Sequence, residues 1–142
     1  MLRYLYTLAT LLDLKSKIKK HYSPGTVISD LFDEDLNEID FIKSLSELEL
    51  IYGFEIPEEL YDSTDLTLGE YGDELSKLPL IPEKGYSEFF DIKFTSMKLT
   101  KRYIELENKT DADSVREIHI INRKFEELDD RLNILLGNTL VN

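Results

Sequence analysis

Residues 35–52 read DLNEIDFIKSLSELELIY, and this stretch decides the fold class. Its apolar side chains recur at the spacing of one helix face. They are Leu36, Ile39, Phe41, Ile42, Leu45, Leu48 and Ile51. Acidic residues crowd the predicted first turn, where the helix dipole favours negative charge. Gly53 follows as the predicted C-cap. We therefore predict a helix from about Asp35 to Tyr52.

The same periodicity extends in both directions from this segment. A first helix is predicted over residues 5–18, with lysines near its C-terminal end, before Pro24 and Gly25 break it. A short helix is predicted over residues 68–78, ending before Pro79. No stretch has the alternation of a β-sheet. The sequence therefore predicts an all-α fold.

The last third of the chain predicts two longer helices. The first runs from about Ser87 to Glu107 and carries two apolar stripes, so we expect neighbours on two sides. A turn with Asp111 or Asp113 as N-cap precedes the second helix. That helix has apolar residues at nearly heptad spacing. They are Val115, Ile118, Ile121, Phe125, Leu128, Leu132 and Leu135. We predict a helical bundle in residues 1–80 and a two-helix extension in residues 81–142, which packs within the chain or forms a homodimer.

Composition narrows the possible functions. The chain has 142 residues and a net charge of −12, from 29 acids against 17 bases, and it contains no cysteine. Disulfides and a cysteine nucleophile are therefore excluded. The acidity disfavours nucleic acids and anionic membranes as partners. Residues 4–14 are too short to span a bilayer and lack a signal-peptide cleavage site, so we expect a cytoplasmic protein.

The acids are concentrated in one segment. Residues 29–83 hold 17 acids against the two bases Lys43 and Lys77. Apolar residues alternate with these acids throughout, which favours a folded acidic surface over a disordered tail.

Three motifs in this acidic segment resemble those of acyl carrier proteins. Residues 29–45, SDLFDEDLNEIDFIKSL, are similar to the family's D-L-G-x-D-S-L motif and the helix that follows it. Residues 52–57, YGFEIP, resemble its F-x-I-x-I-P turn, and residues 66–71, LTLGEY, resemble the opening of its last helix. The resemblance covers about residues 5–78 and implies an acyl-carrier-like helical bundle. Residues 79–142 have no counterpart in a minimal carrier.

The residue at the family's attachment site departs from the pattern. Carriers bind 4′-phosphopantetheine through a serine, and Asp35 occupies that position here. A hydroxyl attacking coenzyme A gives a stable phosphodiester, whereas a carboxylate would give an anhydride that hydrolyses readily. We therefore expect no cofactor. 4′-Phosphopantetheine would be expected only if the alignment slips to Ser29 or Ser44.

The resemblance also implies an acidic docking face for a basic partner, such as a fatty-acid or polyketide type enzyme. The candidate partner-binding residues are Asp33, Glu34, Asp35, Glu38, Asp40 and Glu47, with Glu49 further along the helix. Asp35, with Asp33 and Glu34, would imitate the phosphate of a loaded carrier. The competing interpretations are ordinary acids at a helix start and a solvated helix face.

Three functions from different classes remain open. The first is a non-catalytic interaction module with a carrier-like core. The second is a genuine acyl or aminoacyl carrier, and the third is an acidic inhibitor or immunity-type protein. We expect no enzyme, because no nucleophile, phosphate loop or metal set can be named. His21 and His119 match no metal-ligand spacing.

Overall fold

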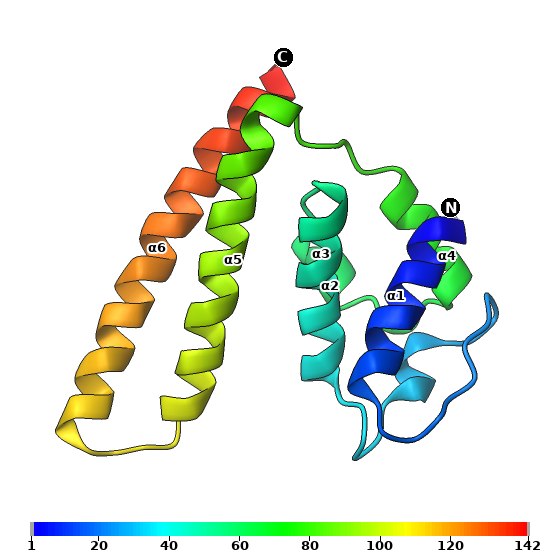
Figure 1. Cartoon of the computed structure of the whole chain (residues 1–142), viewed down its shortest axis with the longest axis horizontal. Helices are drawn as coiled ribbons and strands as arrows, with labels where there is room; N and C mark the ends of the chain where they lie inside the picture. The colour runs from blue at the N-terminus through cyan, green and yellow to red at the C-terminus, as the bar shows by residue number, and fades with distance from the viewer. Residues whose placement is uncertain (1, 142) are drawn as a thin grey trace. The chain divides into compact units, whose positions relative to one another are not determined.

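The chain has an all-α fold, shown in Figure 1. The computed structural model describes the backbone of residues 2–141 and the side chains of residues 2–137. Within that part there are six α-helices, one 3₁₀ turn and no strand. The elements are α1 (Leu2–Lys15), η1 (Ile28–Leu31), α2 (Glu38–Tyr52), α3 (Glu58–Tyr61), α4 (Leu68–Ser76), α5 (Glu83–Leu106) and α6 (Ala112–Val141). The chain divides into two compact units, residues 1–80 and 81–142.

The unit of residues 1–80 is a small helical bundle in which α1 packs against both α2 and α4. Its core draws side chains from each of these helices and from the connecting segments. The largest fully buried ones are Leu8, Leu12, Ile28, Leu36, Phe41, Leu45, Leu48, Phe54, Ile56, Leu68 and Tyr71. Burial of each such side chain contributes roughly 1.5–3 kcal/mol relative to its exposure.

Local signals set the ends of two of these helices. Thr67 and Glu70 form a capping box at the start of α4. Gly53 ends α2 with φ 69° and ψ 41°, and its N–H donates to Glu49 O at 2.8 Å. This left-handed conformation favours glycine, so the predicted C-cap is confirmed.

The unit of residues 81–142 is an antiparallel hairpin of α5 and α6. Its seam buries Phe89 and Ile92 of α5 against Leu128 and Leu132 of α6. The near-heptad stripe of α6 is therefore directed at α5 of the same chain. Asp111 accepts hydrogen bonds from Ser114 N at 3.0 Å and Ser114 Oγ at 2.8 Å, as expected of a residue that caps α6.

Apart from the start of α2, which is described with the site below, three predicted helix boundaries are wrong. Helix α1 ends at Lys15, not at residue 18, because the following backbone N–H groups are bound by a carboxylate described below. Only Lys15 of the lysine run therefore lies in its last turn. Helix α4 ends at Ser76 rather than residue 78. Helix α5 begins at Glu83, four residues earlier than predicted, directly after Pro82, whose carbonyl accepts from Gly85 N at 2.8 Å.

Candidate functional site

Residues 32–37, which connect η1 to α2, are the centre of the candidate site. Asp33 folds this connection by accepting hydrogen bonds from Asp35 N and Leu36 N, both at 2.9 Å, through one carboxylate oxygen. Its other oxygen pairs with the Lys20 ammonium. The ammonium and the backbone donors hold the pKa of Asp33 below its usual range. The carboxylate of Asp33 is therefore engaged within its own chain.

Asp35, at the position of the carrier serine, binds the loop that follows α1. Its carboxylate accepts the Ser16 hydroxyl, Lys17 N at 2.9 and 3.1 Å, and Ile18 N at 3.1 Å. The Ser16 hydroxyl and then the two N–H groups hold its pKa below the usual range. These donors favour the charged form, so Asp35 acts as a structural clamp on residues 16–18.

Helix α2 begins three residues later than the sequence predicts. The helix begins at Glu38, with Asn37 as N-cap: Asn37 Oδ1 accepts from Asp40 N at 3.0 Å, and Asp40 accepts from Asn37 N at 3.1 Å. This capping box sets the helix start. Asp33, Glu34 and Asp35 therefore precede the helix, and the prediction that the helix begins near Asp35 is wrong.

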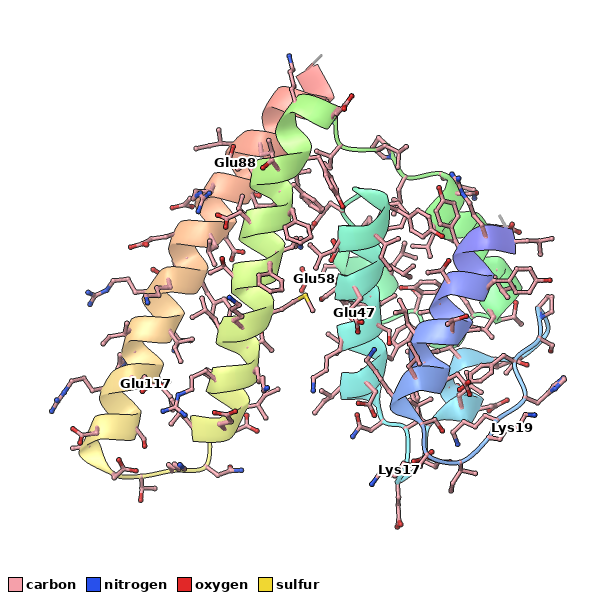
Figure 2. All side chains as sticks on the ribbon, viewed as in Figure 1. Lys17, Lys19, Glu47, Glu58, Glu88 and Glu117 are labelled. Atoms are coloured by element: carbon pink, nitrogen blue, oxygen red, sulfur yellow. The ribbon has the colours of Figure 1, made fainter. Side chains whose placement is uncertain are left out.

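An open depression of about 580 Å³ lies at this connection. Lys17 and Ile18 line one side, and residues 33–35 line the other. Figure 2 labels Lys17 in the loop after α1, and Glu47 on α2. Both signs of charge meet in the depression, and its carboxylates at positions 33 and 35 already have donors.

The predicted docking acids separate into engaged and unengaged groups. Glu47 pairs with Lys15 of α1, and Asp40 belongs to the capping box. Glu34 and Glu38 are exposed and make no hydrogen bond or ion pair within the described residues. The structure thus leaves two of the six candidate acids fully available.

Glu49, predicted on the same face, is fully buried, and that prediction is wrong. Its carboxylate accepts hydrogen bonds from Ile56 N at 2.9 Å and from the Tyr61 hydroxyl at 2.8 Å. Burial and this carboxylate raise the pKa of Tyr61. Glu49 therefore fastens the segment after α2 to the core instead of facing solvent.

The two alternative serines differ in access. Ser44 is fully buried, and its hydroxyl donates to Asp40 O at 2.9 Å. Ser29 is exposed in η1. A phosphopantetheinyl transferase could reach only the second of these two without opening the bundle.

The sequence interpretation missed Ser16 and the backbone of residues 17 and 18. Their role depends on a contact between the end of α1 and a loop almost twenty residues later. The lysine-rich composition of this segment gave no sign of it, because backbone donors leave no signature in the sequence. Lys20, which pairs with Asp33, could have been suggested by charge alone.

The histidines and acids outside this region do not gather into a metal site within the described part of the chain. His119 is exposed on α6, and no group of three or more metal-ligating side chains gathers among the described residues. No described helix is long and apolar enough to cross a membrane. Comparison with protein-family models, curated proteins and solved structures gives no match for this chain.

Proposed function

We propose that residues 1–80 are an acyl-carrier-like interaction module that is not modified and that docks a basic partner through the start of α2. The observation that carries the proposal is the surface formed by Glu34, Glu38, Ile39 and Ile42. In α2, Ile42 lies four residues after Glu38 and three after Ile39, so these three side chains lie on one side of the helix. We call these four residues the α2 surface.

The composition of the α2 surface fits a protein partner. Ile39 is 48% exposed and Ile42 is 38% exposed on the helix that Glu38 begins. Glu34 lies in the connection just before the helix, and neither Glu34 nor Glu38 has a hydrogen-bond or ion-pair partner in the described chain. Apolar contacts flanked by charge are the usual arrangement of a docking patch, in which the charges steer association. A cationic enzyme that recognises carrier helices, of the fatty-acid or polyketide type, is the partner class that the sequence resemblance implies.

The order of elements supports the carrier-like interpretation of the bundle. The motif of residues 29–45 leads into the second long helix, and residues 66–67 lead directly into α4. Asp35 is the residue that departs from the carrier motif, and its carboxylate binds the backbone of the loop after α1. Asp35 therefore has a structural role. Glu34, whose carboxylate has no partner in the described chain, is the acid that would imitate the phosphate of a loaded carrier.

Intact mass tests the absence of modification. The full chain is incubated with coenzyme A and a phosphopantetheinyl transferase, with a standard carrier as positive control. We expect no phosphopantetheine adduct. A stable adduct would establish the alternative of a genuine carrier, and peptide mapping would then show whether Ser29 carries it.

Charge reversal tests the α2 surface. Binding of the full chain to a purified carrier-dependent condensing enzyme is compared for the wild type, Glu38→Lys and Asp73→Lys. Asp73 is an exposed acid of α4, so its reversal changes the net charge equally. We expect Glu38→Lys to weaken binding by about tenfold or more and Asp73→Lys by much less. Equal losses would show that bulk charge, not this surface, governs binding. No binding at all would favour the inhibitor or immunity class.

A further inference from the structure

Helix α5 has a second apolar face that its own hairpin does not use. The face directed at α6 includes Phe89 and Ile92, both buried. On the opposite side, Phe90 is 43% exposed and Phe94 is 44% exposed, and their rings stack with centroids 5.8 Å apart. Ile104, 36% exposed, continues this side toward the C-terminal end. A single-seam hairpin cannot cover both faces of α5.

Charges of opposite sign mark the two ends of this outer face. Glu83 lies in the first turn of α5, and Lys101 lies five turns later on the same side. Both are exposed, and neither forms an ion pair within the described chain. Lys98 lies over the Phe94 ring at 4.5 Å, at the basic end. The outer face is thus acidic at one end, aromatic in the middle and basic at the other end.

This pattern is complementary to its own reversed copy. Consider two copies of α5 that pair antiparallel about a two-fold axis at the level of Ile92. A residue that lies a given number of positions before Ile92 in one copy then faces the residue that lies the same number of positions after Ile92 in the other copy. Phe90 then faces Phe94 of the second copy, and Glu83 faces Lys101. We propose that α5 forms an antiparallel homodimer through this outer face, with a second copy of this chain as its occupant. A two-fold interface of this kind needs a self-complementary surface.

The distribution of net charge also favours a second copy. Residues 81–142 contain 12 acids and 10 bases, whereas residues 1–80 contain 17 acids and 7 bases. Pairing two nearly neutral hairpins incurs little repulsion. The dimer also joins two hairpins into a four-helix arrangement, in which α5 has a neighbouring helix on each of its two apolar sides. The inference concerns different residues from the α2 surface and is independent of it.

Sedimentation velocity of the full chain over a concentration series tests the pairing. We expect a dimer for the wild type, and a dimer dissociation constant raised several-fold for Glu83→Lys and for Lys101→Glu, because each places like charges opposite each other. The double variant Glu83→Lys/Lys101→Glu restores opposite charges and should restore the dimer. Arg123→Glu, on the exposed outer side of α6, is the matched control and should remain dimeric. A monomeric wild type, or a double variant that dimerises no more tightly than the single variants, would overturn the proposal.

A direct substitution in the middle of the face gives a second readout. Phe94→Asp should raise the dimer dissociation constant by more than about tenfold, because it places a carboxylate against the opposing Phe90 ring. Circular dichroism checks that helix content is retained, as expected at a position already 44% exposed. An unchanged dissociation constant with intact helices would place the dimer contact elsewhere and overturn the proposal.

Disulfide trapping tests the antiparallel register. The chain has no cysteine, so any disulfide that forms must join the introduced thiols. Phe90→Cys chains labelled with ¹⁵N are mixed with unlabelled Phe94→Cys chains and oxidised, and the products are identified by mass. We expect the mixed disulfide in excess of random pairing, and none from Asp130→Cys on the outer side of α6. An excess of either same-site disulfide would indicate a parallel pair and overturn the register.

Discussion

The units of residues 1–80 and 81–142 differ in how deeply they bury their apolar residues. Of the twelve largest fully buried side chains in the described chain, eleven lie in the first unit, and only Phe89 lies in the second. Helices on several sides can enclose a side chain, whereas a hairpin covers only one stripe of each helix. The first unit therefore encloses its own core, while the second leaves large apolar side chains of α5, such as Phe90 and Phe94, partly exposed.

The two units also use polar groups differently. The bundle buries Glu49 with two donors, and the Tyr71 hydroxyl donates to Leu60 O at 2.7 Å. The hairpin is instead bridged by exposed ion pairs: Arg102 contacts Glu117 of α6, and Arg131 contacts acids of α5. Buried hydrogen bonds are costly to break, whereas exposed ion pairs contribute little. We therefore expect sensitivity to polar substitutions mainly in residues 1–80.

The largest effect should follow truncation of the bundle core at Phe41. Phe41 is fully buried, and its ring lies 5.6 Å from that of Tyr71 and 5.9 Å from that of Phe32. Phe41→Ala should lower the free energy of unfolding of residues 1–80 by about 3–5 kcal/mol through lost contacts and a cavity. Hydrogen exchange by mass spectrometry in a urea series measures each unit separately. Equal loss of protection in α5 and α6 would contradict separate unfolding of the two units.

A smaller loss should follow removal of the buried carboxylate. Glu49→Ala leaves Ile56 N and the Tyr61 hydroxyl without their acceptor, which should cost the bundle about 1–3 kcal/mol. Glu58→Ala removes an exposed acid from α3 and serves as the control. Urea unfolding with circular dichroism compares the two variants. If Glu49→Ala lowered the free energy of unfolding no more than Glu58→Ala, the buried hydrogen bonds of Glu49 would contribute no net stability. The two units would then not differ in their dependence on polar groups.

The sequence predicted the helices well and the site only in part. Periodic apolar residues located every long helix, and Gly53 and Asp111 marked helix ends, because such signals act within a few residues. The position of Glu49 was wrong, because a glutamate has the same sequence signature whether it is solvated or is a buried acceptor. The contacts of Asp35 were missed for a related reason: they involve backbone groups brought close only by the tertiary fold.

A local effect should follow from loss of the Asp35 clamp. Asp35→Ala removes the acceptor of Lys17 N and Ile18 N, so exchange of these two amide protons should become faster while the core stays protected. Glu34→Ala, at the preceding position, is the control, because Glu34 makes no hydrogen bond or ion pair with the residues that the structure describes. Because the pKa of Asp35 is lowered in the fold from its ordinary value of 3.8, its contribution is complete above that value. It is lost as pH falls through the lowered pKa. Wild-type amides that exchanged as fast as those of Asp35→Ala at neutral pH would contradict the clamp.

The smallest effect should come from the exposed ion pairs that bridge the hairpin. Arg131 lies 3.7 Å from Glu88 and 3.5 Å from Asp91, the former labelled on α5 in Figure 2. Its side chain is 44% exposed, so water and salt screen the attraction. Arg131→Gln should reduce hairpin stability by less than about 1 kcal/mol, and the difference from wild type should shrink at high salt. Arg123→Gln is the control, because Arg123 lies on the same helix and forms no ion pair among the described side chains. A larger, salt-independent loss would mean that these charges are shielded from solvent, and the hairpin would then depend on its polar groups as strongly as the bundle depends on Glu49.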